Sequence, residues 1–334
     1  MTGLVNERVI YMFDVIALGE LLIDFTSHGM SENGSPLFEQ NPGGAPANVL
    51  VALSKLGKNT AFLGMVGIDQ FGSFLKNVLI ENNVNTEGLK FSETVNTTLA
   101  FVHLKKDGDR VFSFYRNPGA DMMLTEKDLN LELIKNSKIF HFGSLSLTDE
   151  PSRSATLAAV TYAKESGLII SYDPNLRPLL WSSLDEAKKQ IISCLKFADI
   201  LKISEEEFHF ITGINDLDIG TEILFNQGIS IILITLGEEG CYYRYKGGSG
   251  IVKGFKVNAI DTTGAGDGFL GGVLFNFCNM SLSEINDINK ERFEQIIKMG
   301  NAVGALVTTK KGAIPSMPTL DEINNLLFYF NSNN

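Results

Sequence analysis

Residues 261–277 read DTTGAGDGFLGGVLFNF, a glycine-rich turn followed by an apolar helix. A strand-like segment, KVNAI at 256–260, leads into the turn. The N–H groups of Gly264, Ala265 and Gly266 would lie in the first turn of this helix, where they have no intrahelical partner and the helix dipole favours negative charge. The turn is therefore predicted to form an anion hole for a transferring phosphoryl group.

Asp267 lies just inside the same turn, where a carboxylate would repel an anion unless it had a separate function. Accepting a proton from an attacking hydroxyl is such a function. The alternative is that Asp267 only complements the helix dipole, an effect of about 0.3–1 kcal/mol. That alternative leaves unexplained a set of glycines that each cost about 1 kcal/mol inside a helix: Gly264, Gly266, Gly268, Gly271 and Gly272. We expect a ligand close to this backbone, with Asp267 as general base.

Outside this stretch, short apolar runs alternate with segments of helical period, which predicts an α/β fold of βαβ units around a mostly parallel sheet. Helices are predicted over 47–57, where Gly57 would end the helix, and over 183–198, where a serine would cap it. No linker or repeat interrupts the chain, so one domain is expected. Strands are predicted at 14–20, 60–67, 138–144, 168–175, 199–204 and 229–237.

One interval, 97–116, breaks the alternation because it consists of two β-like runs joined by Asp-Gly at 107–108. Asp-Gly favours a tight hairpin turn. A hairpin inserted into a βαβ series should stand out as a flap. Phe112, Phe114 and Arg116 would share one face of it by the period of two; whether the aromatic residues only pack on the sheet stays open.

Composition excludes several classes of function. The 334 residues carry a net charge of -11, with no basic stripe for nucleic acid. No apolar run reaches about 18 residues, and the first 15 residues lack a signal-peptide pattern, so a cytoplasmic protein that does not bind membranes is expected. The cysteines, Cys194, Cys241 and Cys278, form no CxxC pair and the histidines no HExxH pattern, which argues against zinc and disulfides.

A second glycine cluster, NPGGAPAN at 41–48, precedes the first long helix. Gly43 and Gly44 would let a ligand approach the main chain, and Asn48 would offer a donor and an acceptor to a hydroxyl. A plain helix start remains an equal alternative. Together, the two clusters suggest a polyol bound beside Asp267 and a polyphosphate at the turn, with the flap excluding water during phosphoryl transfer.

Two other nucleotide-binding motifs bear on the function of this chain. Gly266, Gly268 and Gly271 form a literal GxGxxG, and Glu291 falls near the offset of a ribose-binding acid. A dinucleotide fold also needs a second strand before that acid, whereas residues 281–299 are polar with helical period. The chain contains no GxxxxGK[ST], which excludes a P-loop kinase.

From Val15 to Pro318 the chain resembles the ribokinase-like carbohydrate kinases of the PfkB family, in the two segments GGAPAN and DTTGAGDGF. Residues 114–122 and 173–181 look most like bacterial fructokinases. The resemblance implies a three-layer αβα, Rossmann-like fold spanning 1–334 as a single domain, with lid strands at about 20–42 and 97–116. It also implies ATP-dependent conversion of fructose to fructose 6-phosphate, with Mg²⁺ and K⁺. The sequence does not fix the oligomeric state, but an exposed flap with aromatic residues such as Phe112 could pair with the flap of a second copy and form a homodimer through the lid.

The alternatives within the resemblance are a 2-keto-3-deoxygluconate kinase, a ribose or nucleoside kinase, and a non-catalytic sugar-binding protein. In place of the family motif NxxE, residues 204–207 read SEEE, a pattern also typical of a helix capping box. Glu207 can still order Mg²⁺-bound water, since a carboxylate is a hard ligand; the role of Ser204 is open.

The resemblance also implies functions for individual residues. The sugar site would contain Asp24, Gly43, Gly44, Asn48, Arg116 and Asp267. The nucleotide site would contain Asn175, Arg177, Ser204, Glu207, Thr235, Gly237, Gly240, Gly264, Gly266 and Asn301. The loop for a monovalent cation would contain Asp261, Thr263, Lys310, Gly312 and Ser316.

Overall fold

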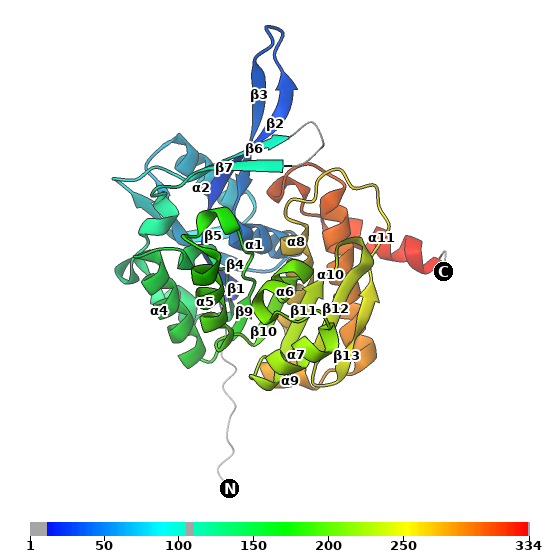
Figure 1. The fold of residues 1–334 in the computed structure, drawn as a ribbon. Coiled ribbons are helices and arrows are strands. Elements are labelled where there is room, and N and C mark those ends of the chain that lie inside the picture. Colours follow the sequence, from blue (N-terminus) through cyan, green and yellow to red (C-terminus); the bar gives the residue numbers. More distant parts are fainter. Residues whose placement is uncertain (1–11, 105–109, 333–334) are drawn as a thin grey trace.

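The computed structural model describes residues 12–104 and 110–332. It contains a nine-stranded central sheet in the order β13-β12-β11-β10-β9-β8-β1-β4-β5 and a four-stranded lid sheet in the order β3-β2-β6-β7. The central strands run parallel from β5 to β11, and β12 and β13 complete one edge as antiparallel strands. Figure 1 shows β2 and β3 projecting from the body, with β6 and β7 at their base.

The elements have the following bounds. Central strands are β1 (Phe13–Leu18), β4 (Thr60–Gly67), β5 (Val84–Ser92), β8 (Ser137–Phe142), β9 (Ile169–Tyr172), β10 (Ile200–Ser204), β11 (Ile231–Thr235), β12 (Gly240–Tyr245) and β13 (Gly248–Lys253). Lid strands are β2 (Leu22–Met30), β3 (Pro36–Gly43), β6 (Leu99–Leu104) and β7 (Arg110–Tyr115). Helices are α1 (Ala45–Lys55), α2 (Gln70–Glu81), α3 (Leu131–Lys135), α4 (Ser152–Glu165), α5 (Leu184–Leu195), α6 (Glu205–Thr212), α7 (Leu217–Asn226), α8 (Ala265–Phe277), α9 (Leu282–Asn286), α10 (Lys290–Thr308) and α11 (Leu320–Ser332). Short 3₁₀ helices span Ala120–Met123, Glu126–Asp128, Leu145–Leu147, Pro178–Leu180, Gly237–Glu239 and Ile314–Ser316.

Each of the six strands predicted in the βαβ series lies in the central sheet, because parallel strands covered on both faces are continuous apolar runs. The strand-like segment at 256–260 forms no strand, which corrects that prediction. β4, for example, is buried along its whole length. The predicted helix signals also function as expected. Ser183 caps α5 by accepting a hydrogen bond from the N–H of Glu186, and Gly57 follows α1 with a left-handed φ of 86°.

Helices cover both faces of the central sheet and produce three layers. One apolar cluster packs α1, α8 and α10 against the sheet, with Phe62, Phe269 and Phe293 among its buried members. The other packs α4, α5 and α6 against the opposite face around Phe140 and Phe208. The predicted three-layer αβα fold is confirmed, and the carboxyl ends of the parallel strands face the lid (Figure 1).

The lid differs from a simple hairpin flap. The strands of 97–116 are β6 and β7, and β6 pairs in parallel with β2, so that both predicted segments join one sheet. The Asp-Gly turn predicted at 107–108 and the side chain of Phe112 lie outside the described residues. Within residues 12–104 and 110–332, no helix has the length and apolar character needed to cross a membrane.

Candidate active site

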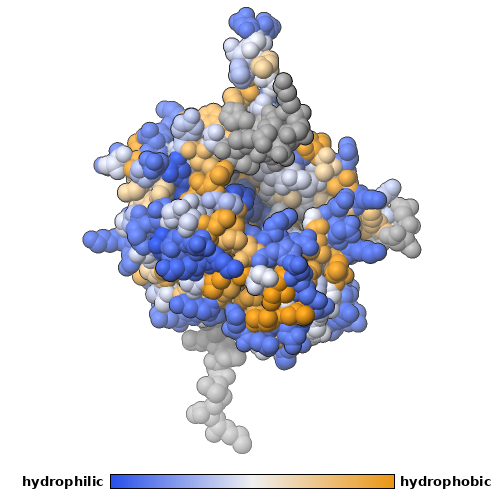
Figure 2. Space-filling view, viewed as in Figure 1, coloured by the Kyte–Doolittle hydropathy of each residue, from blue (hydrophilic) through white to orange (hydrophobic). Residues whose placement is uncertain are grey.

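A cleft of about 730 Å³ lies between the lid and the carboxyl ends of the central strands. In the space-filling view, the surface is hollowed below the base of the lid (Figure 2). Parts of the chain that are distant in sequence supply its walls. Among them are the lid (Asp24, Thr26, Phe114), the start of α1 (Gly44, Asn48) and the start of α8 (Gly264, Gly266, Asp267).

Asp267 is buried in the wall of this cleft, at the first turn of α8. Its Oδ2 accepts a 2.8 Å hydrogen bond from Nδ2 of Asn48. Burial and, to a smaller extent, the charge of Asp173 raise the pKa of Asp267 to about 6, although Lys202 and Asn48 act to lower it. The carboxylate therefore suits proton uptake near neutral pH.

The turn before Asp267 partly matches the predicted anion hole. Gly264 begins α8 in the left-handed conformation with φ 77°, and a Cβ atom there would lie 2.7 Å from Cβ of Ala313. Within the described chain, the N–H groups of Gly264 and Gly266 have no hydrogen-bond partner. The N–H of Ala265 departs from the prediction, because it donates to the carbonyl of Thr262 at 3.2 Å and is already satisfied inside the turn.

A buried ion pair that we did not predict lies directly behind this turn. Nζ of Lys202 on β10 donates to Oδ2 of Asp173 at 2.8 Å, and both side chains are at least nine-tenths buried. Burial alone would lower the pKa of Lys202, but the charges of Asp173, Glu207 and Asp267 outweigh it and raise the pKa. Lys202 lines the cleft, and a Cβ atom added to Gly266 would lie only 2.7 Å from its Nζ. A permanent positive charge thus faces the anion-hole turn.

The sequence contained a signal for this lysine. Lys202 is the one charged residue within the buried part of β10, where every neighbour is apolar. A charged side chain in such a strand needs a partner, and Asp173 comes directly after β9, which pairs with β10. The same layer contains His141, hydrogen-bonded to Ser171 at 3.1 Å, and burial lowers its pKa to about 4.

The structure brings the predicted sugar residues Asp24, Gly43, Gly44 and Asn48 together. Burial raises the pKa of Asp24 to about 6. Any side chain at Gly43 would collide with the Asp24 carboxylate, and Gly44, with φ 121°, lies against the backbone of Glu20. The Oδ1 atom of Asn48 is buried without a partner in the described chain, so an acceptor remains for a ligand hydroxyl.

Arg116 has a different environment from the one predicted. Its side chain is 2% exposed, and its Nε donates to Oδ2 of Asp121 at 2.7 Å. The remaining nitrogens donate to the Thr148 hydroxyl and the Leu145 carbonyl, each at 3.0 Å. Leu145 lines the cleft, whereas Arg116 does not. In this structure the arginine supports the wall behind the sugar side.

A second cavity, of about 270 Å³, adjoins the cleft and contains the predicted nucleotide-strand residues Thr235, Gly237 and Gly240, together with Asn301. The Nδ2 atom of Asn301 donates to the carbonyls of Val252 and Lys253 at 2.9 and 3.1 Å. The two cavities share three lining residues, Thr235, Thr262 and Gly266. A nucleotide in the smaller cavity would thus extend toward Asp267 past Gly266.

The remaining predicted phosphate-side residues, Asn175, Arg177, Ser204 and Glu207, all line the cleft. Asn175 has a positive φ of 48°, a strained conformation that is common at functional sites. The two oxygens of Glu207 accept from the N–H groups of Leu176 and Ser204 at 2.6 and 2.8 Å. The Ser204 hydroxyl accepts from the Glu207 N–H, so the capping-box alternative is present as well.

The predicted cation loop is organised by Asp261. Its Oδ1 accepts from the N–H and hydroxyl of Thr263, and its Oδ2 accepts from the N–H of Gly312. The Ser316 hydroxyl donates to the Lys311 carbonyl nearby, while Nζ of Lys310 pairs with Glu322 at 2.7 Å. In the described parts of the chain, no three His, Cys, Asp or Glu residues cluster as metal ligands do. The loop fits a cation held mainly by backbone and hydroxyl oxygens.

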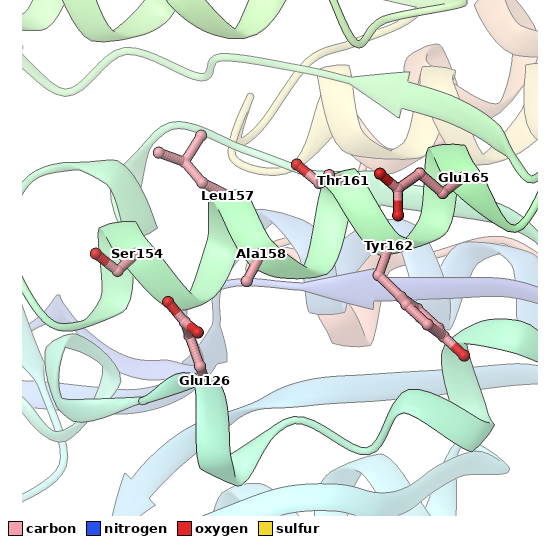
Figure 3. A pocket seen from close by; sticks show the side chains of 7 residues that line it. All are labelled: Glu126, Ser154, Leu157, Ala158, Thr161, Tyr162 and Glu165. Carbon is pink, nitrogen blue, oxygen red and sulfur yellow. The ribbon is translucent and has the colours of Figure 1, made fainter.

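Another hollow, of about 410 Å³, lies along α4, away from the cleft (Figure 3). Its walls are one face of α4 and the side chain of Glu126. The seven lining residues include two carboxylates and no basic group: Glu126, Ser154, Leu157, Ala158, Thr161, Tyr162 and Glu165. A polyphosphate is not expected there.

Comparisons with known proteins agree with this geometry. Residues 12–320 match the model of the pfkB family carbohydrate kinases. The chain is 47% identical over 316 residues to probable fructokinase-4 of Arabidopsis thaliana, covering 94% of this chain and 96% of that protein.

Two solved structures are similar over most of their length. Fructokinase of Xylella fastidiosa with bound ATP has a TM-score of 0.87 and 33% identity, covering 96% of this chain and 100% of that one. A double mutant of fructokinase from Vibrio cholerae O395, with fructose, ADP and potassium ion bound, has a TM-score of 0.84 and 33% identity, with the same coverage. A match over nearly the whole chain places this protein in the pfkB family of carbohydrate kinases.

Proposed function

We propose that this carbohydrate kinase transfers the γ-phosphate of ATP to fructose and forms fructose 6-phosphate. The observation that carries the proposal is the convergence of a carboxylate, a cation and free N–H groups at one point of the cleft: Asp267, Lys202 and the turn of Gly264 and Gly266. The fructokinase relatives support fructose as the acceptor.

In this mechanism, Asp24, Asn48 and the Gly43-Gly44 backbone hold the sugar so that its primary hydroxyl lies beside the Asp267 carboxylate. Asp267 takes the hydroxyl proton while the oxygen attacks the γ-phosphorus, and the bond from that phosphorus to the β-phosphate oxygen breaks. The N–H groups of Gly264 and Gly266 and the Lys202 ammonium stabilise the charge on the transferring group. ADP and the phosphorylated sugar result.

The ions are part of the proposal. Glu207 fits water-mediated binding of Mg²⁺, because its carboxylate lies in the cleft wall and each of its oxygens accepts one backbone hydrogen bond, which leaves acceptor positions for water. The Asp261 loop fits a monovalent cation such as K⁺. When bound, these ions would supply positive charge to the nucleotide phosphates and rigidity to the turn before α8.

The lid is proposed to exclude water and to pair with a second copy. Phe25 and Phe101 stack at 4.8 Å on the lid, and Tyr115 beside them is 66% exposed. Exposed aromatic surface on a sheet favours association. Light scattering after size exclusion tests the homodimer, and a monomer at working concentration would refute it.

The cytoplasmic location stays a prediction, which cell fractionation tests.

A coupled ADP-release assay tests the acceptor with fructose, ribose, 2-keto-3-deoxygluconate and adenosine. We expect fructose to give the highest kcat/KM. A higher value for one of the other acceptors would replace fructose within the same family. Absence of ADP release with every acceptor would favour a non-catalytic sugar-binding protein.

A further inference from the structure

A buried carboxyl group on the sugar side of the cleft has no function in the mechanism above. Glu20 comes after β1, is 4% exposed, and lines the cleft together with Asp24, Gly44 and Asn48. Its Oε1 accepts a hydrogen bond from the N–H of Ala45 at 2.8 Å. None of the basic side chains in the described residues forms an ion pair with it.

The carboxyl group of Glu20 retains hydrogen-bonding capacity that the protein does not use. Burial raises the pKa of Glu20 to about 7; backbone hydrogen bonds lower it, and the charge of Asp121 raises it more than Arg116 lowers it. A carboxyl group has about four acceptor positions when ionised and a donor when protonated. The N–H groups of Ala45 and of Glu20 itself occupy part of this capacity, and the rest is left for a hydroxyl group from the cleft. Because Glu20 lines the cleft, a ligand hydroxyl there can use this capacity.

The hydrogen bond from the N–H of Ala45 also gives Glu20 a structural role at the start of α1. The N-cap of α1 is Gly44, which has no side chain to cap the helix, and the first turn of α1 contains no acidic residue. Glu20 therefore supplies the negative charge that this helix start lacks. Because α1 carries Asn48, and Asn48 donates to Asp267, the position of Glu20 bears on the sugar side of the cleft and on the proposed base.

We propose that Glu20 is a further sugar-binding residue, which bonds a hydroxyl of the ketose that Asp24 and Asn48 do not contact. The inference rests on the proposed function, since it assumes that a sugar occupies the cleft. A site that satisfies a buried polar group through one substrate hydroxyl discriminates strongly against analogues that lack it. Glu20 would thus help to determine which sugars are accepted.

The test compares fructose with analogues that each lack one hydroxyl, in wild type and in Glu20→Met, Glu20→Gln and the exposed control Glu32→Gln. Glu20→Met should raise the KM for fructose by about 10- to 100-fold, the range for a hydrogen bond to a charged group, and leave the KM for ATP unchanged. One analogue should lack the hydroxyl that Glu20 contacts. For that analogue, Glu20→Met should change KM less than about threefold, because the hydrogen bond is absent before the substitution is made. Glu20→Gln retains polar atoms and should recover most of the affinity; the control should match wild type.

An equal loss for every analogue would overturn the proposal and leave Glu20 as a support for α1 alone. Unchanged KM for fructose in Glu20→Met would overturn it as well. If Glu20→Met does not fold, as judged by its thermal midpoint, Glu20→Ala, which also removes the carboxyl group but adds no bulk, provides the same comparison among analogues. A wild-type protein that phosphorylates no ketose would defeat the proposed function instead, so the two failures are distinguishable.

Discussion

The two cavities that meet at Gly266 have walls of different chemistry, so we expect them to bind their ligands by different means. The sugar side of the cleft is walled by polar side chains, among them Glu20, Asp24 and Asp267. The nucleotide cavity is walled largely by glycine, alanine and apolar residues, and the amide nitrogen of its Asn301 is bonded to the protein backbone. Single side chains should therefore dominate sugar binding and chemistry, whereas shape and main chain should dominate nucleotide binding.

The largest effect is expected for Asp267→Asn, on the polar side. The kcat should fall by about 10²–10⁴, the contribution of a general base, while the KM values for fructose and ATP stay within a few-fold. Asp185→Asn is a matched control, because it also changes an acidic residue in the first turn of a helix, α5. Steady-state ADP release measures both variants. Near-normal turnover of Asp267→Asn would remove the proposed base.

Arg116→Ala tests whether the wall behind the sugar side is structural. Removing one partner of a buried ion pair typically lowers the free energy of unfolding by about 3–5 kcal/mol, because Asp121 remains buried and charged. Chemical denaturation measures it, and the double variant Arg116→Met/Asp121→Leu should recover part of the loss. Normal stability with a raised KM for fructose would instead return Arg116 to the sugar site.

Lys202→Met tests the charge at the junction of the cavities. In wild type, kcat/KM should fall as the pH drops below about 6, because protonated Asp267 cannot accept a proton. Lys202 lowers the pKa of Asp267, so its removal should move this acid limb to higher pH. The kcat should also fall by about 10²–10³. The exposed control Lys189→Met should leave the pH profile unchanged. If the acid limb of Lys202→Met does not shift, Lys202 does not set the pKa of the group that accepts the proton.

The smallest effect is expected for Asn301→Ala in the nucleotide cavity. The variant loses two hydrogen bonds to backbone carbonyls, so the free energy of unfolding should fall by about 1 kcal/mol. The KM for ATP should change less than about threefold. A tenfold rise in that KM with unchanged stability would mean that a side chain recognises the nucleotide, and the contrast between the cavities would not hold.

The sequence allowed the layers of the fold and the position of Asp267 to be predicted, because both depend on local pattern. Apolar runs specify buried parallel strands, and a glycine-rich helix start specifies a close backbone approach. The partners of Arg116 were not predictable in this way, since Thr148 and Leu145 approach it only in the folded chain. Glu20 was missed because its partner, the start of α1, is 25 residues away.

The close approach at Gly266 limits which amino acids this position can accept. Even one methyl group there would press on the Lys202 ammonium at the shared boundary of the two cavities. Every amino-acid change reachable from a glycine codon by one nucleotide adds at least that much. Any single-nucleotide change that replaces Gly266 with another amino acid would therefore displace the Lys202 ammonium at the boundary between the two cavities.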